Sequence, residues 1–206
     1  MDALRQPLEA GLLSLGLPFD GVQVDRLLKF LHLLDKWGST YNLTAIRDPR
    51  VAIDLHLLDS VLVLPHLTGA SRILDVGTGA GLPGIPLAIL MPGSQFVLLD
   101  RSAKKIRFVR QAILELGLAN VEAVASRIED FEPHGGAFDA ILARAFASLL
   151  EIRGMTSRLL APEGRIAALK GRFPEDELAE LGAVGAEVRP LVLPGVAVDR
   201  HLVLYR

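Results

Sequence analysis

The stretch that decides the fold is Asp75-Val76-Gly77-Thr78-Gly79-Ala80-Gly81-Leu82-Pro83-Gly84. It follows an apolar run at 72–74 and leads into the apolar segment 85–90. A strand, a glycine-rich turn and a helix in this order present backbone N–H groups to a nucleotide-like ligand in α/β proteins. Glycine permits a positive φ in such a turn and lets the ligand approach the backbone. Two chemistries use this turn: hydride transfer with a dinucleotide and methyl transfer from S-adenosylmethionine.

Outward from the turn, strand-like segments alternate with segments of helical spacing. Strands are predicted at 72–76, 95–100, 121–125, 138–142, 164–169 and 201–205, and helices at 82–91, 102–117, 146–160 and 174–182. This alternation predicts an α/β fold with a doubly wound, mostly parallel sheet. A further strand over 188–193 is separated from the last one by a turn segment at Pro194-Gly195, so we expect these two to pair antiparallel.

Residues 1–70 show helical patterns instead. Apolar residues between Val24 and Leu34 recur at helical spacing. Asp48-Pro49 has the N-cap and first-turn proline that begin a further helix. We therefore predict a helical N-terminal extension over residues 1–70 and an α/β domain over 71–206.

The composition limits the classes of partner. Half of the 206 residues are hydrophobic, which allows a sizeable core, and no apolar run approaches the roughly 20 residues of a membrane span. The formal net charge is −2, so nucleic-acid binding would depend on a local basic patch. The chain has no cysteine, which excludes thiolate nucleophiles and zinc–sulfur clusters. We expect a cytoplasmic protein, because no signal-peptide pattern begins the chain. We also expect neither a bound metal nor a membrane partner.

The glycine turn can be interpreted in two frames. Gly79 to Gly84 is a G-x-G-x-x-G, and Asp100 follows about 20 residues on, as in an NAD-dependent oxidoreductase. The other frame places Asp75 two residues before alternate glycines, which resembles the first motif of class I S-adenosylmethionine-dependent methyltransferases. The second frame is favoured because the dinucleotide glycine should follow its strand directly, and Gly77 and the next residue intervene. In the methyltransferase class Asp100 would accept hydrogen bonds from the ribose hydroxyls; the alternative is a helix N-cap.

Five ordered segments carry a more specific resemblance. They are Lys36–Thr44, His56–Ser60, Gly77–Pro86, Arg144–Leu149 and Ala168–Gly171. Together they resemble the bacterial small-subunit ribosomal RNA methyltransferase G family, also called glucose-inhibited division protein B, from about residue 24 onwards. Leu55 and Ala80 depart from the family pattern, where a basic residue and a proline are usual.

The resemblance implies a methyl transfer from S-adenosylmethionine to nitrogen seven of one guanosine in small-subunit rRNA. The partner would be this rRNA or the small ribosomal subunit, and we expect a monomer. Two other hypotheses stay open: an NAD-dependent oxidoreductase, and a non-catalytic RNA-binding or ribosome-assembly module.

The resemblance and the class analogy also imply a set of donor contacts. The residues are Gly77, Thr78, Gly79, Leu82, Asp100, Ile128, Glu129 and Arg144. Ile128 would cover the adenine face and Glu129 would accept from its amino group, since both follow a strand whose carboxyl end lies beside the glycine turn. Glu129 could otherwise be a solvated loop acid, and Arg144 could pair with Asp139 or Glu151 rather than face the donor and the target base.

RNA contact is predicted from local basic groups. The candidates are Lys104, Lys105, Arg144, Lys170, Arg172, Arg200 and His201. Such clusters bind phosphate without recognising sequence, although the basic helix at 101–110 also fits an ordinary solvated face. Trp37, Tyr41 and Phe146 are candidates for stacking on an unpaired base, with core packing favoured for Trp37.

The chemistry that the resemblance implies requires no base. Nitrogen seven of guanine has a free lone pair, so its attack on the donor methyl removes no proton. We therefore predict no catalytic general base, and we expect His56 to be a helix-surface or capping residue. Catalysis would depend on placing the nitrogen in line with the methyl carbon.

Overall fold

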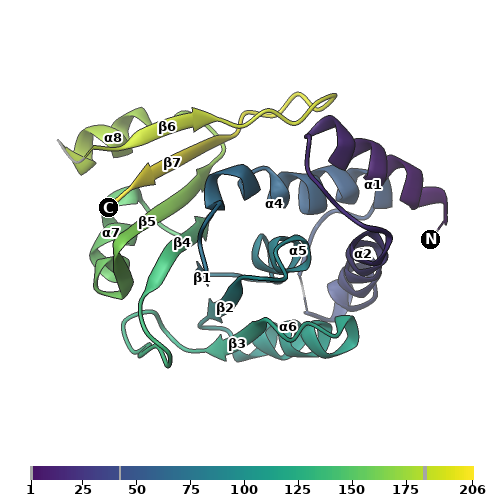
Figure 1. Ribbon diagram of the computed structural model, residues 1–206, viewed down its shortest axis with the longest axis horizontal. Coiled ribbons are helices and arrows are strands. Elements are labelled where there is room, and N and C mark those ends of the chain that lie inside the picture. Colours follow the sequence, from purple (N-terminus) through teal and green to yellow (C-terminus); the bar gives the residue numbers. More distant parts are fainter. Residues whose placement is uncertain (1, 42, 183–184) are drawn as a thin grey trace.

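The computed structural model describes residues 2–41, 43–182 and 185–206. Within these ranges the strands form one seven-stranded sheet in the order β3-β2-β1-β4-β5-β7-β6 (Figure 1). The strands are β1 (Arg72–Val76), β2 (Gln95–Asp100), β3 (Val121–Ala125), β4 (Phe138–Arg144), β5 (Leu160–Lys170), β6 (Glu187–Pro190) and β7 (His201–Tyr205). The first five pair parallel, whereas β7 runs antiparallel to both β5 and β6. The predicted, mostly parallel sheet with an antiparallel C-terminal end is confirmed.

Three strands differ in length from the prediction. β4 runs on to Arg144, and β5 begins early because Leu160 pairs with Phe138 before a register shift. β6 ends at Pro190, although the apolar run continues to residue 193. Leu191 and Leu193 are buried against the core of the N-terminal helices, so this apolar run is a packed loop rather than a strand.

The N-terminal part of the chain is helical, as predicted. Its elements are α1 (Asp2–Ser14), α2 (Gly21–Tyr41), α3 (Pro49–Ala52), the π-helix η1 (Ile53–Leu58), α4 (Asp59–Val61) and the 3-10 helix η2 (Leu64–Leu67). Asp48 caps α3 by accepting from the Arg50 N–H at 2.8 Å, with Pro49 in the first turn. None of the helices in the described ranges has the length and apolarity to cross a membrane.

Two of the four later α-helices in the described ranges, α6 (Ala103–Leu116) and α7 (Leu149–Thr156), begin at a side-chain cap. The other two are α5 (Gly84–Leu90) and α8 (Glu175–Leu181), and the 3-10 turn η3 (Ser157–Leu159) follows α7. The side chain of Ser102 caps α6, and Gly117 ends it with a φ of 64°. Ser148 and Glu151 form a capping box, so α7 begins three residues later than predicted.

The helices lie in two layers, one on each face of the sheet (Figure 1). The layer with α1, α2, α5 and α6 lies on one side, and α7 and α8 lie on the other. Alternation along β1 sorts side chains between these faces, because Ile73 belongs to the first core and Leu74 to the second. Leu8 and Phe30 share the first core with Phe96 of the sheet, so the N-terminal helices pack directly on the α/β part. The division into residues 1–70 and 71–206 stays a prediction.

Candidate active site

The chain leaves β1 in a tight turn whose shape requires glycine. Gly77, Gly79 and Gly81 have φ values of 68°, 58° and 83°. A Cβ in this left-handed region costs roughly 1–2 kcal/mol. Between these glycines, the Thr78 N–H donates to the carbonyl of Leu99 on β2 at 3.0 Å. The turn is thereby tied to the neighbouring strand and exposes its backbone at the carboxyl end of β1.

The carboxylate of Asp75 lies beneath the turn and holds it to the start of α5. Its Oδ2 accepts from the Thr78 hydroxyl at 2.6 Å and from the Gly84 N–H at 3.0 Å, and the residue is 1 % exposed. Burial raises the pKa of Asp75 to about 6, although both hydrogen bonds lower it. A Cβ on Gly84 would lie 2.2 Å from Leu98 Cδ2. The last glycine of the apparent dinucleotide fingerprint therefore serves packing, a role that the sequence did not reveal.

Asp100 ends β2 and faces the turn. Its Oδ2 accepts from the Gly79 N–H at 2.9 Å, and its Oδ1 accepts from the Ser102 N–H at 2.8 Å. The N-cap of α6 is Ser102, so the alternative interpretation of Asp100 as that cap is wrong. Because a carboxylate has about four lone-pair sites, both oxygens can still accept from hydroxyls. Its contact with a ribose stays a prediction.

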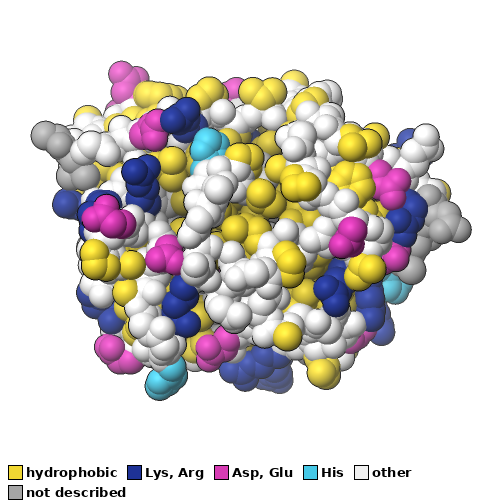
Figure 2. All heavy atoms as spheres, viewed as in Figure 1, with side chains coloured by type: hydrophobic (Ala, Val, Ile, Leu, Met, Phe, Trp, Pro, Cys, Tyr) yellow, Lys and Arg dark blue, Asp and Glu magenta, His cyan; other side chains and the backbone are white. Residues whose placement is uncertain are grey.

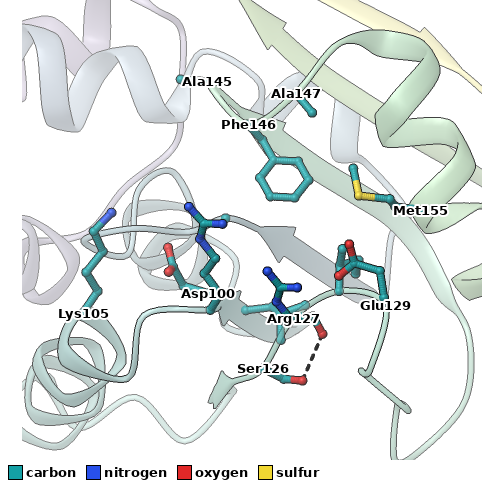
Figure 3. A pocket seen from close by; sticks show the side chains of 13 residues that line it. Asp100, Lys105, Ser126, Arg127, Glu129, Ala145, Phe146, Ala147 and Met155 are labelled. Atoms are coloured by element: carbon teal, nitrogen blue, oxygen red, sulfur yellow. Dashed lines mark hydrogen bonds between the residues drawn. The ribbon is translucent and has the colours of Figure 1, made fainter.

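A cavity of about 400 Å³ opens over the carboxyl ends of β1, β2 and β3 (Figure 3). The order of strands reverses at β1, which lies between β2 and β4, and open α/β sheets bind ligands at such a point. Figure 3 shows the Phe146 ring directed into the cavity, between Asp100 on one side and Glu129 on the other. A Cβ on Gly77 would lie 2.4 Å from Phe146 Cδ2, so the glycine leaves room for this ring.

The structure brings together only part of the predicted site at this cavity. The predicted residues in its lining are the donor contacts Gly77, Asp100, Ile128 and Glu129, the RNA candidate Lys105, and Phe146, whose stacking on an unpaired base stays a prediction. Four other predicted donor contacts, which stay predictions, lie outside this lining: Thr78, Gly79, Leu82 and Arg144. Sequence reasoning missed Arg127 and Met155. Arg127 lies two residues after the end of β3 and could have been found by that position, whereas Met155 reaches the cavity only through the packing of α7.

Two arginines, Arg158 of η3 and Arg72 of β1, donate to carbonyls of the loop after β3. The Nη2 atom of Arg158 donates to the carbonyls of Ile128 at 2.9 Å, Glu129 at 3.3 Å and Phe131 at 2.8 Å. This loop occupies the place of a helix between β3 and β4, and within it the carbonyl of Ile128 also accepts from the Phe131 N–H at 3.3 Å. Arg158 therefore fixes the backbone that carries two residues of the cavity lining.

Arg144, at the end of β4, points to a different neighbour from those considered in the sequence. Its Nη1 donates to Asp59 Oδ2 at 3.3 Å, and Arg200 Nε donates to Asp59 Oδ1 at 2.6 Å. The predicted alternatives are wrong, because Asp139 accepts from backbone N–H groups at the start of β1 and Glu151 belongs to the capping box. Asp59 thus joins two arginines that lie far from it in the sequence.

The other predicted RNA contacts lie in different surroundings. Lys170 is largely buried, and its Nζ donates to Glu177 Oε2 at 2.7 Å and to the Ala147 carbonyl at 2.9 Å. His201 packs edge-on against Phe173, 5.6 Å between ring centroids, whereas Arg172 is exposed.

The basic residues of α6, including Lys104 and Lys105, form a surface cluster. Figure 2 shows lysine and arginine side chains gathered at the lower edge of the molecule, over this helix. All of the RNA contacts named from the sequence stay predictions. The side chain of Tyr41 lies outside the described part of the chain, and Trp37 packs against the N-terminal core.

His56 is buried within η1, so the prediction of a helix-surface residue is wrong. Its Nε2 lies 2.7 Å from the Thr44 hydroxyl. Burial, and then the nearby charge of Arg144, lower the pKa of His56 below 6.5. The side chain is therefore neutral near pH 7, and it braces η1 against the segment after α2.

Comparisons with known proteins agree with this geometry. The family model described as rRNA small subunit methyltransferase G matches residues 23–203. A relative of that name from Methylococcus capsulatus is 56 % identical, covering 95 % of both chains, and one from Nitrosococcus oceani is 50 % identical, covering 100 % of this chain and 97 % of the relative.

Solved structures support the fold independently. A putative O-methyltransferase from Klebsiella pneumoniae matches with a TM-score of 0.59 at 20 % identity, covering 91 % of this chain and 90 % of the other. A putative caffeoyl-CoA O-methyltransferase from Staphylococcus aureus matches with a TM-score of 0.59 at 12 % identity, over 85 % and 91 % of the two chains. The sequence motifs, the cavity at the carboxyl ends of the strands and the matching family model lead to one conclusion. The chain belongs to the rRNA small subunit methyltransferase G family.

Proposed function

We propose that this protein transfers a methyl group from S-adenosylmethionine to nitrogen seven of a guanosine in small-subunit rRNA. The observation that carries the proposal is the cavity between the glycine turn, Asp100 and the loop after β3, in a chain of this family. We further propose that the protein works as a monomer in the cytoplasm.

The lining of the cavity fits the donor. Asp100 offers acceptor capacity for ribose hydroxyls, and Ile128 and Phe146 offer apolar surface for an adenine ring. The positive φ of Gly77 and the Phe146 ring packed beside it leave no room for a side chain at this position of the lining. S-adenosylmethionine supplies an electrophilic methyl group on a sulfonium.

The protein's contribution is positioning and exclusion of water. No proton leaves guanine nitrogen seven during the transfer, and the neutral, hydrogen-bonded His56 is not needed as a base. Asp75 and Asp100 fix the turn from below and from the side, which holds the donor floor rigid. Holding two reactants in line can lower a barrier by about 7–11 kcal/mol.

The test has a binding arm and a transfer arm. Calorimetry should show binding of S-adenosylhomocysteine and none of NAD, and Asp100→Ala should abolish the binding. Purified protein with labelled donor should place one label per small ribosomal subunit, on a 7-methylguanosine found by mass spectrometry after nuclease digestion. Running naked rRNA beside assembled subunits identifies the form of the substrate. Labelling of another base atom, or no labelling of either substrate despite donor binding, would overturn the proposal.

A further inference from the structure

The segment His56–Ser60 stands out in the sequence, yet the donor cavity makes no use of it. Within it, Asp59 begins α4 and is 4 % exposed. Its two carboxylate oxygens each accept from a different arginine, Arg144 at 3.3 Å and Arg200 at 2.6 Å. The three residues come from three distant segments, so the tertiary fold assembles this cluster.

The two arginines lie at the same edge of the sheet. Arg144 ends β4, and Arg200 immediately precedes β7, whose first residue pairs with the last residue of β5. This is the carboxyl edge of the parallel strands, which also forms the donor cavity over β1, β2 and β3. The arginines therefore lie beside the donor cavity, on the side of β4, β5 and β7.

The side chains of the two arginines retain access to solvent. Their side chains are 23 % and 27 % exposed, against 5 % for the Asp59 side chain. Each guanidinium has five N–H donors in a planar fork, and such forks recognise phosphate oxygens and the O6 atom of guanine. The carboxylate is thus buried while both arginine side chains stay partly exposed, and Arg200 Nη1 also donates to the Asp199 carbonyl at 2.9 Å.

The charge of this cluster suits the proposed reaction. Methylation of nitrogen seven leaves the guanine cationic, and two uncompensated guanidinium groups beside it would oppose that change. One carboxylate between two arginines reduces their formal charge from +2 to +1.

We propose that Asp59 is a positioning residue that holds Arg144 and Arg200 as one unit for binding the target nucleotide of the RNA. The ligand is an oxygen acceptor of that nucleotide, either its phosphate or guanine O6. This inference rests on the proposed function, and it assigns the acceptor side of the site.

The test is a double-mutant cycle on binding and turnover. Asp59→Asn, Arg200→Met and the double variant are compared for the KM and Kd of small ribosomal subunits, for kcat, and for the Kd of S-adenosylhomocysteine. Each single variant should raise the KM and Kd for the subunit about 10-fold, and Arg200→Met, which leaves Arg144 paired with Asp59, should change donor binding less than about 2-fold. The double variant should be no more than about 3-fold worse than the poorer single variant, because both changes disable one unit.

Asp139→Asn is the matched control. Asp139 also accepts two hydrogen bonds, at 2.8 and 2.9 Å, but at the opposite edge of the sheet. The Asp139→Asn variant loses the same charge as Asp59→Asn and should leave subunit binding unchanged. The salt dependence of binding separates the two ligand oxygens, since losing a phosphate contact reduces the slope of log Kd against log salt by about one.

Several results would overturn the inference. They are single effects that multiply to about 100-fold in the double variant, a loss of donor affinity with unchanged subunit binding, or an equal effect of Asp139→Asn. Arg200→Met keeps the test informative if Asp59→Asn does not fold, because an unchanged subunit Kd in that variant also refutes it. A wild type that binds subunits without methylating them refutes the proposed function, while the binding cycle still tests Asp59.

Discussion

Ionisation of the buried Asp75 carboxyl group should lower the free energy of unfolding of the protein as the pH rises from about 4 to 6. Its carboxyl group is buried under the glycine turn, and its pKa is raised from 3.8 to about 6. In this interval the folded state binds more protons than the unfolded state, so the free energy of unfolding falls with increasing pH. Replacement by asparagine removes the titration and keeps the shape of the side chain.

The size of the effect follows from the two pKa values. At 1.36 kcal/mol per pKa unit, the difference between 3.8 and about 6 corresponds to ~3 kcal/mol. This stabilisation is fully present below the unfolded-state pKa near 4, and it is lost as the pH rises through the folded-state pKa of about 6. The amide in the Asp75→Asn variant cannot titrate, so any cost of burying it is the same at every pH.

Urea unfolding of the wild type and of Asp75→Asn from about pH 4 to about pH 8 measures the effect. The stability of the wild type relative to the variant should fall by ~3 kcal/mol over this range, mostly between about pH 4 and 6. Thr78→Val removes the hydroxyl that lowers the pKa of Asp75, so in that background the fall should extend to higher pH. A relative stability that is constant within ~0.5 kcal/mol, or that rises with pH, would refute the reasoning.

Three further substitutions test the site and its supports. Gly77→Ala should weaken S-adenosylhomocysteine binding at least 10-fold in calorimetry, because φ at Gly77 is 68° and the new Cβ would meet the Phe146 ring. Gly93 has open space around it, so equal weakening by the control Gly93→Ala would contradict this prediction. Arg158→Met should raise the KM for the donor about 10-fold and speed amide hydrogen exchange in the loop after β3, with the KM for the subunit unchanged; slow exchange in that loop would count against it. Lys170→Met should lower the free energy of unfolding by ~2 kcal/mol through loss of a charged hydrogen bond to α8, and unchanged denaturant unfolding would show that this bond contributes nothing.

The pattern of the sequence predicted most of the sheet and brought part of the proposed donor contacts to one cavity. Strand periodicity, the glycine turn and capping residues such as Ser102 act over a few residues, so their outcome is readable locally. The carboxyl ends of neighbouring parallel strands must meet, which placed Asp100 and Glu129 at one cavity. The prediction of a strand over 188–193 was wrong beyond residue 190, because a buried leucine in a loop and a buried leucine in a strand give the same apolar pattern in the sequence.

The sequence by itself determined the family, the α/β fold and the glycine turn, since these depend on local spacing and on ordered motifs. Only the tertiary structure decided which charged partners meet. Asp59 finds Arg144 85 residues away and Arg200 141 residues away, and Lys170 pairs with Glu177 on the next helix. The sequence does not indicate which oppositely charged side chains pair, because the pairing depends on which segments the packed cores bring together. The cluster around Asp59, on which the proposed acceptor side rests, is therefore a product of the fold, whereas the glycine turn follows from local sequence.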